Sequence, residues 1–447
     1  MSEDTSGRAG SPGLRRVITV RHAVAIYISS VLGAGILVIP GLAAKAAGAG
    51  SLFAWALLSL ASYPFAYTFS RLSARRPESG GIYSFAKEAF GRSVSTTTAW
   101  LFVAWVVLGA PAVTLAAGSY LAYAFPISGL GVFLAAAVML LAAFAINIRG
   151  IRLSARVQLG VVATIVAVLS LAVVASAPDV RASNFTPLLP GGVASVGVAS
   201  ALILWSFLGY ENVSNIAEEF ENPERDFARS VTVSVVLVSA LYLAVAFTVV
   251  GTGAFQAGGG VTPFAEMMSH VFGAFGGVAV SLFAVAIIFS TVNAYTAGMA
   301  RIIYAAAKEG SLPRVLATVD PRTGAPRRAL TALYLMIAPS LVAFYFLHVD
   351  LQSAFLVTSG AAILTYVVGS AAGIKLLRAK GAKRALPWVS LVVSLVILPF
   401  IGRLLVVSAV VAAAGLVYGR ARGGPAGAQG IVGPGPAGSD KLPISEA

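Results

Sequence analysis

Apolar stretches of roughly twenty residues recur along most of the chain, and short basic or glycine- and proline-rich segments separate them. A hydrocarbon layer about 30 Å thick requires a helix of about that length. The pattern therefore predicts an all-α membrane protein with about twelve transmembrane helices. Their expected ranges are 22–47, 50–73, 95–125, 128–148, 155–177, 193–219, 229–251, 274–307, 327–348, 351–377, 385–400 and 403–419.

Two of the connecting segments have amphipathic patterns of their own. Pro77–Phe90 is expected to form an interfacial helix on the cytoplasmic side. Thr262–Phe272 is expected to form a short outer-surface helix, with Thr262 as its N-cap. The ends of the chain, 1–15 and 423–447, are rich in Gly, Pro, Ala and Ser, so they are predicted to be disordered cytoplasmic tails.

Composition excludes several classes of protein. The chain is 58% hydrophobic and 11% charged, whereas a soluble globular protein carries roughly 25% charged residues. It contains no cysteine, which excludes disulfides and thiolate metal sites. It also lacks a phosphate-binding loop, a zinc motif and a Ser-His-Asp arrangement. We therefore expect neither an enzyme nor a bound cofactor or metal.

The basic residues indicate how the chain is oriented. The net charge is +14, which raises the alternative of a nucleic-acid-binding protein. Yet, of the 31 lysine and arginine residues, all but Lys45, Arg181 and Arg403 fall in the tails or loops of one side. The positive-inside rule then predicts a multi-pass protein of the inner or plasma membrane with both termini in the cytoplasm. The positive charge is expected to face anionic membrane lipid, and no nucleic-acid partner is expected.

Two expected helices are interrupted near their centres. Ser29–Ile36 contains Gly33 and Gly35, and Trp205–Asn212 contains Gly209 followed by Glu211. Glycine weakens a helix, and unwound backbone is tolerated in a bilayer where it is packed in protein or lines a cavity. Freed N–H groups could face a carboxylate and freed carbonyls an ammonium, so such breaks suit an α-amino acid. Close helix packing is the alternative explanation for the glycines.

The breaks open two successive blocks of five helices that start on opposite sides of the membrane in this topology. Matching interruptions in two inverted halves are typical of a secondary transporter. An ionisable residue in mid-membrane is usually functional, so Glu211 is a candidate for proton coupling, although it could also simply be stabilised by the helix dipole. A channel or an intramembrane enzyme is disfavoured, because repeated pore-lining polar residues and a catalytic cluster are both missing.

Four segments carry a resemblance to a known family: 33–48 (GAGILVIPGLAAKAAG), 77–91, 204–230 and 307–317. They resemble the amino acid–polyamine–organocation (APC) permease superfamily, and most closely its bacterial exporters of methionine and branched-chain amino acids. The resemblance implies a LeuT-like 5+5 inverted repeat with helices 1 and 6 broken, plus two peripheral helices. The expected divisions are 16–177 for the first repeat, 193–378 for the second and 385–420 for the peripheral helices.

The resemblance also implies a substrate site. Backbone N–H groups for the carboxylate would come from Ala34, Gly35 and Ile36, beside Gly33. Acceptors for the ammonium would be the carbonyls of Val31, Trp205 and Leu208, beside Gly209, with the Ser30 hydroxyl nearby. Trp205 would cap the substrate and Tyr295 would form a second aromatic gate. The side-chain pocket would comprise Trp105, Val106, Gly109, Ala110, Pro111, Thr358 and Ser359.

Glu211 is the one acid among these positions, so the expected substrate is a neutral, hydrophobic amino acid of the Met, Leu, Ile and Val class. Transport is expected to proceed by alternating access, with efflux favoured over uptake and with coupling to protons or exchange. Ser290 and Thr291 could contribute to a sodium site, but such hydroxyls usually bond back to their own helix, so sodium is the less favoured ion. Uptake, or transport of other amino acids or amines, is the alternative. The protein is expected to be a monomer or a homodimer.

Overall fold

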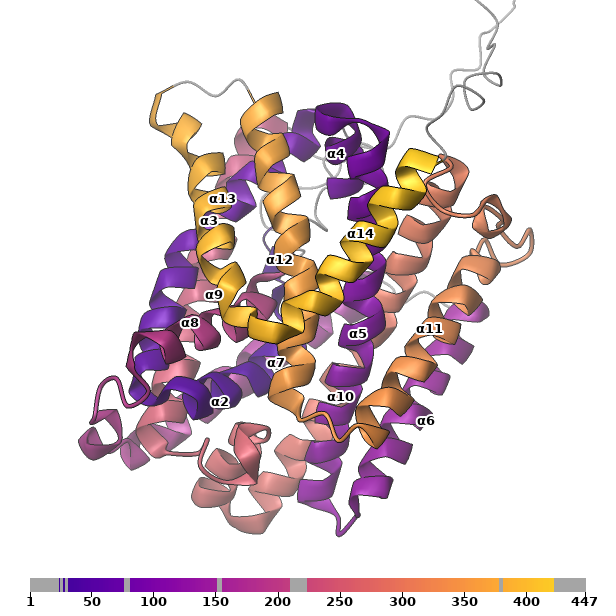
Figure 1. Cartoon of the computed structure of the whole chain (residues 1–447). Coiled ribbons are helices and arrows are strands. Elements are labelled where there is room, and N and C mark those ends of the chain that lie inside the picture. The colour runs from indigo at the N-terminus through magenta and orange to yellow at the C-terminus, as the bar shows by residue number, and fades with distance from the viewer. Residues whose placement is uncertain are drawn as a thin grey trace, which may run out of the picture.

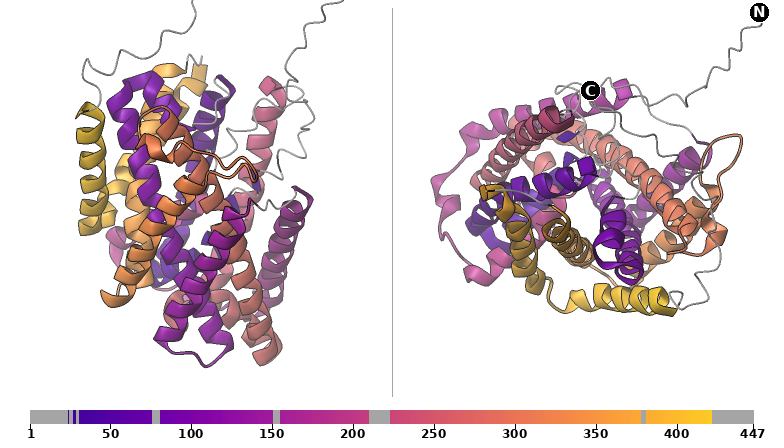
Figure 2. Two further views of the ribbon diagram at one scale, coloured as in Figure 1. Left: turned by 90° about the vertical axis from the view of Figure 1, so that its right-hand side faces the viewer. Right: turned by 90° about the horizontal axis from the view of Figure 1, so that it is seen from above.

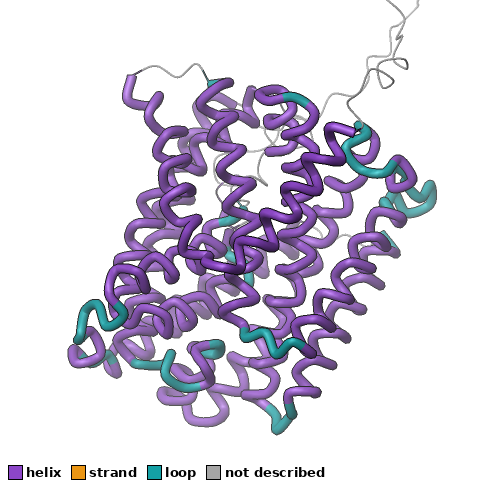
Figure 3. The backbone as a smooth tube through the Cα atoms, in the orientation of Figure 1, coloured by secondary structure: helices purple, strands orange, loops and turns teal. Residues whose placement is uncertain are grey.

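The computed structural model describes residues 24, 27–28, 31–75, 81–150, 155–209, 223–377 and 381–421. Within these ranges the chain forms helices, short 3-10 turns and loops, and no strand occurs (Figure 3). The predicted tails at 1–15 and 423–447 lie outside the described residues.

The helices follow the apolar stretches of the sequence, and parts of all the expected ranges are helical. They are α2 (Gly35–Ala47), α3 (Ser51–Arg75), α4 (Ile82–Phe90), α5 (Arg92–Ala124), α6 (Gly129–Ile148), α7 (Ala155–Ser176), α8 (Gly192–Ile203), α9 (Pro223–Thr252), α10 (Pro263–Lys308), α11 (Arg327–Phe346), α12 (Leu351–Leu376), α13 (Leu386–Ile397) and α14 (Leu405–Ala421).

In the described ranges, 9 helical stretches are long and apolar enough to cross a membrane. Two of these stretches, Gly35–Ser73 and Gly381–Ala421, each join two helices, and the segment Gly192–Phe207 is shorter. These features establish an all-helical membrane protein. The count of about twelve spans and the inverted repeat stay predictions.

Large apolar side chains cover the outside of the bundle. Val138 and Leu141 of α6 are each 65% exposed, and Phe275 of α10 is 83% exposed. A water-soluble protein rarely exposes such a continuous apolar surface. The surrounding hydrocarbon of a membrane explains it, because there these side chains need no burial within the protein.

The 33-residue helix α5 runs through the middle of the bundle. It packs against α10, α12 and α14, and also against α6 and α11 (Figure 1). Seen from above, the bundle is oval and α14 lies along one edge (Figure 2). The central place of α5 lets its residues reach both the interior and the peripheral helices.

Helix α4 was expected to lie at the cytoplasmic membrane interface, and its place relative to the membrane stays a prediction. Its apolar face, including Tyr83 and Phe85, is buried against α5 and α12. The Lys87 ammonium pairs with Glu309 Oε2 at 2.5 Å, and the Tyr83 hydroxyl donates to the same oxygen at 2.9 Å. The amphipathic pattern correctly indicated a helix with one covered face, but protein covers that face in place of lipid.

The expected short helix after Thr262 is confirmed as the first segment of α10. Thr262 occupies the N-cap position without a side-chain capping bond, and α10 kinks at Gly273, whose φ of 65° favours glycine. Just before this segment, the loop at Gly260 touches α2. A methyl group on Gly41 would collide with the Gly260 carbonyl oxygen, so the two backbones are in direct contact.

Candidate functional site

The first broken helix unwinds where the glycines predicted it. Residues 32–34 are non-helical, and α2 begins at Gly35. Within the break the Gly33 N–H donates to the nearby Val31 carbonyl, at 2.9 Å. The first N–H groups of a helix have no partner inside it. The N–H groups of Gly35 and Ile36 therefore face the unwound segment.

The second break is also present. After α8 the chain makes a 3-10 turn at Leu204–Phe207, and Leu208 is then extended, with φ −75° and ψ 144°. Gly209 has a φ of 126°, a value that L side chains rarely adopt. The helix cannot continue through these two conformations. Glu211, the candidate for proton coupling, lies outside the described residues.

The two breaks meet inside the bundle. A methyl group on Gly35 would lie 3.0 Å from Ser206 Oγ and 3.1 Å from Trp205 Cδ1, so α2 begins directly against the second break. The buried Tyr242 of α9 connects them further. Its hydroxyl oxygen lies 3.0 Å from the Val31 carbonyl and 2.9 Å from the Ser206 carbonyl, and its single hydrogen is shared between the two.

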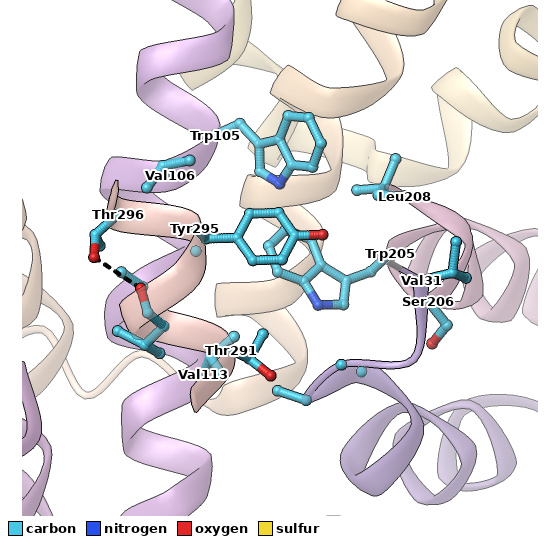
Figure 4. Close-up of a pocket in the computed structure, with 16 residues that line it drawn as sticks. Val31, Trp105, Val106, Val113, Trp205, Ser206, Leu208, Thr291, Tyr295 and Thr296 are labelled. Carbon is cyan, nitrogen blue, oxygen red and sulfur yellow. Dashed lines mark hydrogen bonds between the residues drawn. The ribbon is translucent and has the colours of Figure 1, made fainter. Parts of the chain in front are cut away.

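A cavity of about 550 Å³ lies where the breaks face α5 and α10 (Figure 4). The predicted site residues that line it are Val31, Gly33, Ala34, Gly35, Trp105, Val106, Gly109, Ala110, Trp205, Leu208 and Tyr295.

Aromatic rings form two sides of the cavity. Trp205 makes edge-on contacts with Trp105 and Phe355, with ring centroids 6.1 and 5.7 Å away. Tyr295 extends from α10 across the cavity toward Trp205 (Figure 4). A methyl group at Gly109 would lie 2.6 Å from Trp205 Cη2, so only glycine leaves room for the indole there. The predicted capping and gating roles of Trp205 and Tyr295 stay predictions.

Some predicted site residues do not line the cavity: Ile36, Pro111, Gly209, Thr358 and Ser359. Thr358 and Ser359 are buried on α12, and the Thr358 hydroxyl donates to the Ala354 carbonyl at 2.8 Å. Thr358 lies behind Gly109, since a methyl group there would be 3.1 Å from Thr358 Cγ2. Ser30 lies outside the described residues.

Five further lining residues were not predicted as part of the substrate site: Val113, Ser206, Thr291, Val292 and Thr296. Helical spacing could have found most of these. Val113 follows Gly109 by four residues, and Val292 precedes Tyr295 by three, so each pair shares a helix face. The Thr291 hydroxyl donates to the Ile287 carbonyl at 3.0 Å, which confirms the expected bond back to its own helix.

Polar side chains behind α10 hold this wall in place. Asn147 Nδ2 of α6 donates to Asn293 Oδ1 at 2.9 Å and to Thr296 Oγ1 at 3.3 Å. The Tyr334 hydroxyl of α11 also donates to Thr296 Oγ1, at 3.2 Å. Asn147 and Asn293 therefore connect α6 to α10 by a side-chain hydrogen bond. They fix the rotation of α10 that turns Thr296 toward the cavity.

Within the part of the chain that the structure describes, the residues that line the cavity include no Asp, Glu, Lys or Arg. Polarity comes instead from the ends of the broken helices and from a few Trp, Tyr, Ser and Thr side chains. Among the described residues, no group of three His, Cys, Asp or Glu side chains could hold a metal ion.

The family model for amino acid permeases matches residues 18–423. An uncharacterised amino acid permease of Bacillus subtilis, YecA, is 33% identical over 416 residues, covering 92% of this chain and 97% of its own. The L-methionine/branched-chain amino acid exporter YjeH of Escherichia coli is 28% identical, covering 82% and 88%. The branched-chain amino acid permease BcaP of B. subtilis is 24% identical, covering 80% and 82%.

These matches bear on both the fold and the activity. Amino acid permeases are transporters, so the expectation that the chain is not an enzyme is confirmed. The predicted likeness to APC permeases is also confirmed. The narrower prediction, that exporters are the nearest group, is not shown, because the uncharacterised permease YecA is more similar to this chain than the exporter YjeH is. The chain therefore belongs to the amino acid permease family and is a multi-pass membrane transporter.

Proposed function

We propose that the protein is a secondary active transporter of neutral, hydrophobic amino acids of the Met, Leu, Ile and Val class. The observation that carries the proposal is the meeting of two unwound helices at a cavity whose described lining residues include no charged side chain. An arginine or lysine side chain would lack a counter-ion there. Two relatives are named for methionine or branched-chain amino acids, which supports the same class.

The substrate's α-carboxylate would bind the N–H groups at the start of α2, near Gly35, where the helix dipole favours a negative charge. Its ammonium would bind carbonyl oxygens at the two breaks, such as that of Leu208. Its side chain would lie between α5 and α10. Alternating access of this cavity to the two sides would move the amino acid across the membrane.

We further propose that both termini are cytoplasmic and that export is favoured, with Glu211 coupling transport to protons. The last proposal predicts that Glu211→Gln removes the pH dependence of transport while exchange continues. Unchanged pH dependence in that variant would assign proton coupling to another residue. Faster net uptake than export in oriented vesicles would reverse the proposed direction.

Counter-flow in proteoliposomes tests the function, with radiolabelled leucine outside and one unlabelled amino acid inside. We expect stimulation by Met, Leu, Ile and Val but not by Arg or Glu. Gly35→Val should abolish the signal, because its side chain would crowd Ser206 at the start of α2. Gly160→Val is the matched control, since Gly160 lies exposed on α7 with nothing within 4 Å of an added Cβ.

Failure of every amino acid to stimulate exchange by folded wild-type protein would refute the proposed substrate class and redirect the search to amines. Persistent binding by Gly35→Val would instead refute the carboxylate site alone. Flux that neither saturates nor responds to internal substrate would indicate a channel.

A further inference from the structure

Two buried side-chain groups at the cavity have no hydrogen-bond partner. Other unpaired buried groups occur in the described part of the chain, but Trp105 Nε1 and Ser206 Oγ are the ones whose residues line the cavity. Trp105 is 1% exposed and Ser206 is 2% exposed. An unpaired polar group costs free energy in such surroundings, so both positions call for a partner that enters with the ligand or with water.

The two groups face different parts of a bound amino acid. Ser206 Oγ lies beside the start of α2, 3.0 Å from where a methyl group at Gly35 would be. That is the proposed position of the carboxylate. Trp105 projects from α5, and its indole nitrogen lies on the ring edge that faces Tyr295 and Trp205 (Figure 4). Trp105 therefore faces the space proposed for the substrate's side chain.

The packing of its ring holds Trp105 in this orientation. Phe102 makes an edge contact with a centroid distance of 4.9 Å, and Trp205 makes another at 6.1 Å. The neighbours of Trp105 on the cavity face of α5 are Val106 and Gly109, which offer no side-chain acceptor. The indole N–H is a donor only, and a bound side chain that carries an acceptor can pair with it.

We propose that Trp105 Nε1 donates a hydrogen bond to the substrate's side chain and thereby selects a thioether, that of methionine, over a hydrocarbon of the same length. This inference rests on the proposed function. Sulfur is a weak acceptor on an otherwise apolar chain, which matches a single donor in an apolar cavity. Hydroxyl and amide side chains fit less well, because they bring donors of their own.

Water explains why a hydrocarbon is disfavoured. In the unliganded cavity a water molecule can accept from the indole N–H. A side chain that displaces this water without replacing its hydrogen bond loses affinity. We expect a factor of about five, which corresponds to one ordinary neutral hydrogen bond.

The test compares methionine with norleucine, in which a methylene group replaces the sulfur. Their inhibition constants are measured in the leucine counter-flow assay. Wild-type protein should bind methionine about fivefold more tightly. Trp105→Phe should bring the ratio to about one, because the N–H donor is lost. The smaller phenyl ring also opens space beside the substrate, but that change affects methionine and norleucine alike.

Trp100→Phe is the matched control. Trp100 is also on α5 and its indole nitrogen is also buried without a partner, but it packs against Tyr418 of α14 and does not line the cavity. This variant should keep the wild-type ratio. A loss of selectivity in both variants would attribute the effect to general loosening of α5 and overturn the assignment to Trp105.

The outcomes separate this inference from the proposed function. Equal affinities for methionine and norleucine in wild-type protein overturn the inference, whether or not any variant folds, while leaving amino acid transport intact. A methionine preference that survives Trp105→Phe overturns it as well, since another group then recognises the sulfur. Binding of no amino acid by the wild type refutes the proposed function itself.

Discussion

Removing the Tyr242 hydroxyl should weaken substrate binding, although Tyr242 does not line the cavity. The hydroxyl oxygen lies 3.0 Å from the Val31 carbonyl and 2.9 Å from the Ser206 carbonyl. These oxygens belong to the two broken helices, where the regular helical hydrogen bonds stop. Tyr242→Phe keeps the ring and removes a side-chain donor that connects both breaks.

The size of the effect follows from what is left unpaired. Tyr242 is fully buried, so water cannot readily replace its hydroxyl. Leaving a buried carbonyl without this donor costs about 1–3 kcal/mol. If that free energy holds the breaks in their binding arrangement, substrate affinity should fall by a factor of about 5 to 150. The thermal unfolding midpoint should fall as well.

Tyr120→Phe provides the comparison. Tyr120 is equally buried, and its hydroxyl donates to the Leu37 carbonyl at 2.7 Å. Leu37 lies inside α2, where its carbonyl keeps a helical partner, so we expect a loss of about 1 kcal/mol or less. Both variants and the wild type are compared by thermal unfolding in detergent and by leucine counter-flow. Equal behaviour of the two variants, or unchanged affinity in Tyr242→Phe, would refute the reasoning.

Three further changes have defined outcomes. Gly109→Ala should push Trp205 from its position, because the added methyl would lie 2.6 Å from the indole. Such overpacking costs about 1–3 kcal/mol, and counter-flow should show weaker substrate binding. The Thr323 N–H, with other nearby groups, lowers the pKa of the Asp320 carboxyl. The ionised carboxylate therefore stabilises the fold above its ordinary pKa of about 4, and this stabilisation is lost as the pH falls. The difference in unfolding midpoint between wild type and Asp320→Asn should shrink on acidification. Lys87→Gln breaks an exposed ion pair, so it should cost at most about 1 kcal/mol, and less in high salt.

The breaks could be predicted because glycine acts locally. Gly33 and Gly35 lie at the point where the first helix unwinds, and Gly209 has the positive φ that ends the second. These effects depend on a residue's own backbone freedom and need no knowledge of its neighbours. The helices themselves were predictable for a similar reason, since a bilayer sets one length for every span.

Other features depend on packing that no local pattern reveals. Trp55 and Trp388 both fall near expected membrane boundaries and both suggest interfacial anchors. Trp388 is 53% exposed, but Trp55 is fully buried and its ring centroid lies 5.4 Å from that of Tyr242. The expectation for Trp55 was wrong because depth along a helix does not indicate which way a side chain points. The same limit hid Thr296, since α10 is apolar on most of its faces.

The contact between Gly41 and the Gly260 loop restricts how the transporter can move. No side chain separates the two backbones, and even one methyl group would not fit between them. Such an interface cannot slide without losing its contacts, because neighbouring positions carry bulkier groups, such as Pro263. The α2 segment and this loop should therefore travel as one rigid body. The bending that exposes the cavity then falls to hinges elsewhere, and the non-helical residues 32–34 are suited to act as one.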